Sequence, residues 1–228
     1  MGSSIVLSRE TNDERMKYPA TNALLIIGIS FIVPSCVDHD IRQAVPVKGD
    51  YFPMAEGNRW EYVTKYHCPG ADGAAVCYDT VRYSAEGDAL YWGDDSYKSL
   101  STPYGPFMWI KRSNNEYYAW GAYVPEYKFL DAGLPLHSSW AYDDWGKREF
   151  SLIAVNDTKK VYGIVYKNVI GVLQTESWMN DNGEFVETSR AYHYYAKNIG
   201  EIYAYYPDPP TRYNGEMEVF LIDHIISQ

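Results

Sequence analysis

The sequence is poor in the residues and patterns that mark most catalytic and metal sites. It has three cysteines and five scattered histidines, and none of them falls into a C-x-x-C or H-x-x-H spacing. It has no G-x-S-x-G elbow, no phosphate-binding glycine loop and no cysteine–histidine pair with a base nearby. These absences predict a protein without metal or cofactor and not an enzyme of these classes.

Basic residues are also scarce. The chain has 20 lysines and arginines against 30 aspartates and glutamates, which gives a formal net charge of -10. Nucleic-acid-binding domains carry a basic patch or stripe, and no such cluster occurs here, so we expect no nucleic-acid partner. An acidic charge spread evenly along the chain favours a soluble domain outside the cell.

The chain lacks an apolar run long enough to cross a membrane as a helix. The run Ala23–Val33 has 11 residues, whereas a spanning helix needs about 20. Lys17 precedes this run, and Pro34, Ser35 and Cys36 follow it. A basic start, a short apolar core and small residues at the exit are typical of a secretory signal peptide.

Because a cysteine stands at its exit, the segment Met16–Cys36 resembles the signal peptide of a bacterial lipoprotein. The resemblance implies that residues 16–35 are removed and that Cys36 becomes the lipid-bearing first residue. It implies a protein of the cell envelope that is lipid-anchored to a membrane, most simply the outer membrane, and faces the periplasm or the cell surface. We expect residues 1–15 to be an over-called N-terminal extension, since the true start reads as Met16.

The rest of the chain divides into a tether and one domain. Residues 36–50 are polar, and Pro46 and Gly49 interrupt any periodic pattern, so this segment is predicted to link the lipid to the domain. Residues 51–228 are long enough for a single β domain with a sizeable core.

Alternation of period two is the main pattern in residues 51–228. In Arg59–His67, the side chains of Trp60, Tyr62 and Tyr66 share one face, which is typical of a half-buried strand. Asn182-Gly183 between two such segments is the strongest hairpin signal. Further strands are expected at Tyr78–Ala85, Ala89–Trp92, Tyr97–Leu100, Phe107–Arg112, Glu116–Ala122, Tyr127–Leu130, Phe150–Val155, Val161–Lys167, Asn168–Trp178, Phe185–Tyr195, Ile199–Tyr206 and Glu218–Ile226.

These patterns predict an all-β, mostly antiparallel fold with few or no helices after the signal segment. Both a two-layer sandwich and a strongly curved sheet or open barrel fit them. The strand Glu218–Ile226 is apolar on both faces, so we expect it to lie inside a sheet with Ile199–Tyr206 as its neighbour. A proline corner precedes a Trp-x-Tyr strand start at Pro53 and again at Pro135, which suggests two related halves.

Two motifs of this domain resemble a broad set of uncharacterised β-rich envelope lipoproteins. The first is a P-x-x-x-G-x-x-W-x-Y opening and the second is a late Y-Y-A-x-x-I-G-x-I segment. The resemblance implies a β-rich, lipid-anchored protein and carries no chemistry. Its residues here are Pro53, Gly57, Trp60, Tyr62, Tyr194, Tyr195, Ala196, Ile199, Gly200 and Ile202.

Cys68 and Cys77 flank a short loop rich in glycine and alanine. An oxidising compartment permits a disulfide between them at the open end of a hairpin. A metal site with His67 would need further ligands, so a disulfide is the better interpretation. We expect the two Cα atoms to lie about 4.4–6.8 Å apart.

Aromatic residues are abundant, with 23 tyrosines and 7 tryptophans. Such residues often stabilise strands by cross-strand pairing. The alternative is a ring platform for a sugar or another flat ligand, for which Trp109, Tyr118, Trp120 and Tyr123 are the candidate binding residues. Tyr117 lies on the opposite face of the same strand and cannot join them.

We predict a non-enzymatic, lipid-anchored binding or scaffolding module whose partners are the membrane and a glycan or another envelope protein. One alternative is a carbohydrate-active enzyme, for which Asp94-Asp95 and Asp143-Asp144 are the nearest candidates if their loops converge. Another is a small-lipid carrier with an apolar cavity of several hundred Å³. A filled core with a flat aromatic face would instead favour the binding module.

Overall fold

The computed structural model describes residues 49–68, 75–88, 97–121, 124–143, 146–209 and 214–226. Internal contacts divide the chain into Met1–Asp40 and Ile41–Gln228, and every described residue belongs to the second unit. The signal peptide, Cys36 and the expected strand Ala89–Trp92 therefore lie outside the described residues. Within the described ranges, no helix has the length and apolarity needed to cross a bilayer.

The described chain is all-β, as predicted, and contains strands but no helix. All twelve strands belong to one antiparallel sheet. They are β1 Arg59–His67, β2 Val76–Asp88, β3 Tyr97–Thr102, β4 Gly105–Ser113, β5 Glu116–Gly121, β6 Val124–Asp131, β7 Ser139–Asp143, β8 Lys147–Val161, β9 Ile164–Met179, β10 Phe185–Ala196, β11 Gly200–Tyr206 and β12 Asn214–Ile225.

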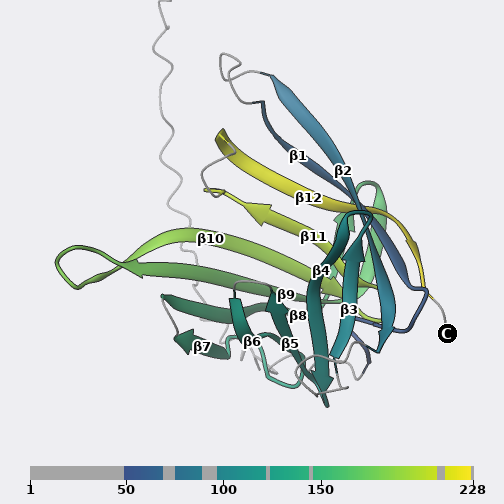
Figure 1. The fold of residues 1–228 in the computed structure, drawn as a ribbon, viewed down its shortest axis with the longest axis horizontal. Helices are drawn as coiled ribbons and strands as arrows, with labels where there is room; N and C mark the ends of the chain where they lie inside the picture. Colours follow the sequence, from purple (N-terminus) through teal and green to yellow (C-terminus); the bar gives the residue numbers. More distant parts are fainter. Residues whose placement is uncertain are drawn as a thin grey trace, which may run out of the picture. The chain divides into compact units, whose positions relative to one another are not determined.

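Two six-stranded meanders build the sheet. Strands β1–β6 follow one another in one half and β7–β12 in the other, and pairing of β1 with β12 joins the halves (Figure 1). The sheet curls, and this brings its two edge strands, β6 and β7, close to each other. The evidence is a hydrogen bond of 2.8 Å that Nε1 of Trp140 in β7 donates to the backbone oxygen of Lys128 in β6. The strongly curved, barrel-like sheet is thus the correct alternative, and the sandwich is not.

The C-terminal strand β12 lies inside the sheet, as its apolar pattern predicted. It pairs with β11 through Tyr203 and Phe220 and with β1 through Thr64 and Val219. Its inner side chain Leu221 is fully buried in the core. A strand with neighbours on both sides and core packing holds the two meanders together.

The prediction of separate strands at Val161–Lys167 and Asn168–Trp178 is wrong. A tight turn at Tyr162-Gly163 lies inside the first segment, with φ values of 47° and 87°, and β9 runs continuously from Ile164 to Met179. Two-residue hairpin turns need such positive φ values, and the surrounding Val, Ile and Tyr residues concealed the turn.

The β8–β9 hairpin is also bent. Its register shifts three times between Leu152 and Thr158, and Asn156 and Asn168 both have positive φ. Such bulges bend a strand away from its neighbours. The bend brings the turn residue Tyr162 to within 6.1 Å of Phe220 in β12, measured between ring centres.

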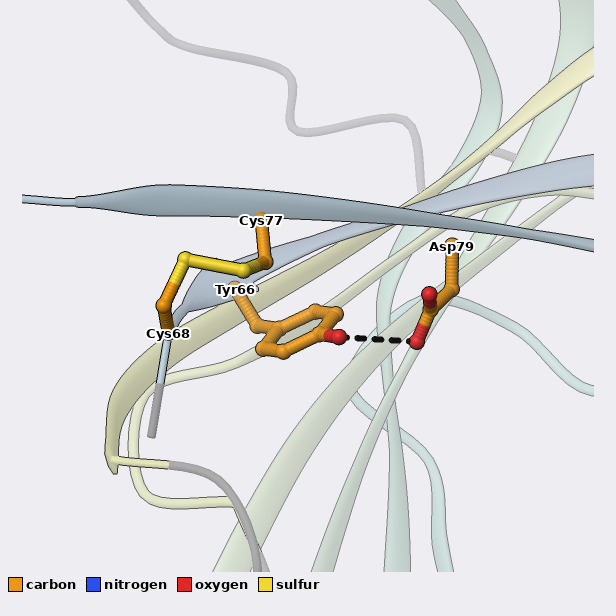
Figure 2. Close-up of a disulfide and its surroundings, with 4 residues drawn as sticks. All are labelled: Tyr66, Cys68, Cys77 and Asp79. Atoms are coloured by element: carbon orange, nitrogen blue, oxygen red, sulfur yellow. Dashed lines mark hydrogen bonds between the residues drawn. A yellow bond between two sulfur atoms is a disulfide. The ribbon is translucent and has the colours of Figure 1, made fainter. Parts of the chain in front are cut away.

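The predicted disulfide joins Cys68 and Cys77 at the open end of the β1–β2 hairpin (Figure 2). Their Cα atoms are 5.2 Å apart, which lies inside the expected range. Beside it, the Tyr66 hydroxyl donates to Oδ2 of Asp79 at 2.8 Å (Figure 2). The two contacts fasten the end of a hairpin whose connecting loop lies outside the described residues.

Candidate functional site

A cavity of about 330 Å³ lies against the concave face of the sheet. Side chains from β1–β6 and β9–β12 line it, so both meanders contribute to its wall. The lining is mainly aromatic and aliphatic. Its members are Phe52, Trp60, Tyr62, Thr64, Val81, Tyr83, Leu100, Phe107, Met108, Ile110, Ala119, Tyr127, Phe129, Gln174, His193, Tyr195, Glu201, Ala204, Tyr206 and Val219.

The segment before β1 contributes Phe52 to the cavity wall and holds it there with polar contacts. The Tyr51 backbone N–H donates to the Tyr117 hydroxyl at 2.8 Å, and that hydroxyl donates to Oδ1 of Asp50 at 3.0 Å. Arg112 pairs with the other oxygen of Asp50 at 3.0 Å. The ring of Phe52 then lies 5.8 Å from the rings of both Trp60 and Phe129, one from each side of the first meander.

The turn between β10 and β11 places the polar residues of the cavity. Gly200 has a φ of 111°, and a Cβ added there would lie 3.2 Å from the indole nitrogen of Trp60, so glycine is needed for two reasons. The same indole donates to the backbone oxygen of Ile199 at 2.6 Å. Gly200 therefore fixes the start of β11 against β1.

His193 and Glu201 form a close polar pair in the cavity wall. Nδ1 of His193 lies 2.6 Å from Oε1 of Glu201, and both side chains are largely buried. The imidazole stacks on Tyr195 at 6.3 Å and meets the edge of Tyr206 at 5.7 Å. The short His193–Glu201 contact and the two tyrosine rings around it hold the polar atoms of this pair at a fixed position in the cavity wall.

Tyrosine hydroxyls complete the polar part of the wall. Burial raises the pKa of Tyr62, Tyr195 and Tyr206, and the negative charge of Glu201 raises each pKa further. The Tyr62 hydroxyl already donates to the backbone oxygen of Glu201 at 2.9 Å. All three phenols therefore remain protonated in the physiological pH range and keep a proton that can be donated.

The carboxylates near the cavity bear on the alternative of hydrolysis between two such groups. Among the described lining residues, Glu201 is the single carboxylate, whereas glycoside hydrolysis needs two. Asp143 ends β7 and does not line the cavity; Asp94, Asp95 and Asp144 lie outside the described residues. Within the described ranges, no cluster of three or more His, Cys, Asp or Glu side chains could hold a metal ion.

The aromatic residues singled out in the sequence lie elsewhere. Trp109 in β4 faces Trp120 in β5 across the ladder with ring centres 4.8 Å apart, and Tyr118 is on the same side. The alternate residues Ile110 and Ala119 point to the cavity, so these rings are on the convex face. Tyr123 lies outside the described residues.

Sequence reasoning did not identify the cavity residues. The strand pattern around His193 and Glu201 does not distinguish them from other sheet residues. The signal that could have found them is the pairing of β10 with β11 around Gly200, because Tyr195 then faces Glu201. To infer from that pairing that both side chains line a cavity, one must also know which face of the two strands points to the inside of the sheet.

Comparisons with known proteins leave the family open. No family model matches the chain, and no curated protein matches it. One similar crystal structure is of a protein inferred to be exported, with a YmcC-like fold, from Bacteroides fragilis NCTC 9343. It has 13% identity and a TM-score of 0.45 over 78% of this chain and 100% of that chain. A second, inferred to be a lipoprotein, is from Parabacteroides distasonis ATCC 8503. It has 11% identity and a TM-score of 0.39 over the same shares. Likeness at this level assigns neither family nor function to this chain.

Proposed function

We propose that this chain is a lipid-anchored envelope protein whose β domain binds a small, largely apolar ligand in the cavity of its curved sheet. The observation that carries the proposal is a cavity of about 330 Å³ with an aromatic wall and the His193–Glu201 pair set into it. Ligand pockets commonly measure about 300–1,000 Å³, are mostly apolar and contain a few placed polar groups. The cavity thus supports a carrier of a small ligand rather than a flat aromatic platform as the main function.

The chemistry of the wall defines the class of ligand. Rings such as Phe52, Trp60 and Phe129 offer apolar and aromatic contact surface. Tyr206 and the His193–Glu201 pair offer a proton donor and an acceptor at one part of the wall. A ligand with an apolar body and one hydrogen-bonding head group matches both parts.

The proposed anchor rests on the sequence alone. Cys36 stands at the exit of the predicted signal peptide, and 15 residues, Cys36–Asp50, precede the first residue of the domain. A fully extended chain covers about 3.3–3.6 Å per residue, so the domain would lie within roughly 50 Å of the membrane. A carrier held at that distance can receive a lipid-like ligand from the bilayer surface.

The test is ligand binding by the mature protein and by a matched pair of variants. Val81 lines the cavity, and the adjacent Thr80 is exposed on the other face of β2. Val81→Trp should fill the cavity and abolish binding of the uncharged probe N-phenylnaphthylamine, followed by fluorescence, whereas Thr80→Trp should bind like the parent. Equal binding by the two variants would refute the cavity as the site.

A second binding role rests on the convex face. Trp109, Tyr118 and Trp120 share that face, and the two indole rings are 4.8 Å apart. They are the described members of the proposed platform for a glycan or another envelope protein. The test is Trp120→Ala, which should weaken that partner's binding and leave the cavity probe bound.

A further inference from the structure

A groove of about 570 Å³ lies on the face of β10 and β11 that points away from the cavity. Its base is formed by Tyr192 and Tyr194 of β10 and by Tyr203 and Tyr205 of β11. These residues alternate along the strands with side chains that line the cavity, so the two sites are on opposite faces of the same strands.

The four tyrosines are ordered by the sheet. Tyr192 pairs across the ladder with Tyr205, and Tyr194 pairs with Tyr203. The ring centres of the two pairs are 6.0 and 5.9 Å apart. Successive pairs lie two residues apart along the strands, at a rise of about 3.4 Å per residue. The groove therefore has two adjacent aromatic positions about 7 Å apart.

Lys159 of the bent β8–β9 hairpin forms one wall of the groove. Its ammonium nitrogen lies 3.5 Å from the ring centre of Tyr194 and 4.6 Å from that of Tyr203. No carboxylate of the described residues lies within ion-pair distance of it. Burial lowers its pKa, and Asp157, acting at longer range, only partly offsets this.

The other described charges near the groove are paired, lie at its rim or stand beside Tyr205, whose side chain hydrogen-bonds the Glu216 carboxylate. Arg190 donates from Nε and Nη2 to the two carboxylate oxygens of Glu187 at 2.9 and 3.1 Å, so its charge is already paired. Asp208 is exposed at the rim. Among the described residues, Lys159 is thus a cation without a close countercharge, held by tyrosine rings in a chain whose formal net charge is -10.

We propose that this groove binds a saccharide that carries a carboxylate. The carboxylate would supply the countercharge that Lys159 lacks, the C–H face of a sugar ring would contact Tyr192 and Tyr205, and phenol groups would hydrogen-bond its hydroxyls. The groove is open to solvent, so it can accept one or more units of a chain. The ammonium of Lys159 favours an acidic sugar over a neutral one at this end of the groove, and the sheet geometry supplies the aromatic contacts.

The test compares two oligosaccharides of equal length, one of galacturonic acid and one of galactose, with the mature protein. Calorimetry should show binding of the acidic oligomer that weakens with added salt. Lys159→Met should weaken it roughly tenfold to a hundredfold, the range for losing a hydrogen-bonded charge pair. Lys160→Met removes the neighbouring exposed lysine and is the matched control, which should bind like the parent.

A second measurement does not depend on a folded variant. The pKa of Lys159 in the parent protein, followed by NMR of its labelled ε-carbon, should rise when the acidic oligomer binds. Equal affinity for the two oligomers, binding of neither, or an unchanged Lys159 pKa at saturation would each overturn the proposal. Val81→Trp, which fills the cavity on the other face, should leave this binding intact and so separates the two proposals.

Discussion

The indole nitrogen of Trp140 in β7 lies 2.8 Å from the backbone oxygen of Lys128 in β6, and this hydrogen bond links the two edges of the sheet. The same indole ring stacks on Phe150 with centres 5.5 Å apart, and the Lys128 ammonium lies 5.8 Å from its centre. Trp60 makes the corresponding contact in β1, where its indole donates to Ile199. In both Trp-x-Tyr strand starts noted in the sequence, the indole therefore donates to a backbone oxygen of another segment.

Replacing Trp140 with Phe tests the edge contact. Phe keeps an aromatic ring beside Phe150 but lacks the donor to Lys128, so the free energy of unfolding should fall by about 1–2 kcal/mol from the lost hydrogen bond and the smaller ring. Chemical denaturation measures this change. Trp178→Phe, on the exposed part of β9, is the control and should change stability by less than about 0.5 kcal/mol. Equal effects would show that the edges are not joined in solution.

The disulfide makes a separate prediction. Reduction, or the double change of Cys68 and Cys77 to Ser, should lower the free energy of unfolding by about 2–3 kcal/mol, since the bond closes a short loop. Denaturation with and without reductant gives the value. A parent protein with two free thiols by mass spectrometry would contradict the structure at this hairpin.

Lipidation is tested at Cys36. Cys36→Ala should abolish incorporation of a labelled fatty-acid analogue and leave the protein unprocessed or soluble, because no thiol remains at the predicted cleavage site. Gel fluorescence after metabolic labelling measures how much of the fatty-acid analogue the protein carries. Labelling that persists in the variant would exclude Cys36 as the lipid site.

Alkaline pH should destabilise the fold. Burial raises the pKa of Tyr62 and Tyr195, whereas phenols in the unfolded chain ionise near pH 10. A raised folded-state pKa adds stability below the unfolded value and loses it as pH rises above about 10. The free energy of unfolding should therefore fall between about pH 9 and pH 11.

Tyr195→Phe tests whether buried phenols cause this loss of stability. The change removes one buried phenol, so the free energy of unfolding should fall less between about pH 9 and pH 11 than in the parent. Tyr78→Phe, at an exposed position, is the control and should behave like the parent. Denaturant melts at the two pH values measure the difference. A fall of equal size in all three proteins would assign alkaline unfolding to other groups.

Much of the fold could be predicted from local pattern, and the site could not. Alternation along Arg59–His67 and the apolar strand Glu218–Ile226 identified strands and even the β11–β12 neighbours. Asn182-Gly183 located the hairpin between β9 and β10, whereas the turn at Tyr162-Gly163 was hidden among β-forming residues. Period two shows that two faces differ but does not show which one is concave. For this reason the sequence pattern predicts Trp109 and Trp120 as binding residues and does not point to His193 and Glu201.

The last prediction concerns the strand that joins the meanders. β12 lies between β1 and β11, so removing Phe220–Gln228 takes core residue Leu221 away and exposes ladder groups on both neighbours. Open, aromatic-rich edges pair with other chains, so the truncated protein should aggregate. Trp120→Ala, on the convex face of β5, should cost a few kcal/mol at most, about the range for large-to-small aromatic changes, and should stay soluble. Soluble yield and thermal melting of both variants, expressed without the signal segment, give the comparison. A truncated protein that remained monomeric and melted like the parent would show that β1 and β11 do not depend on β12, contrary to the sheet order.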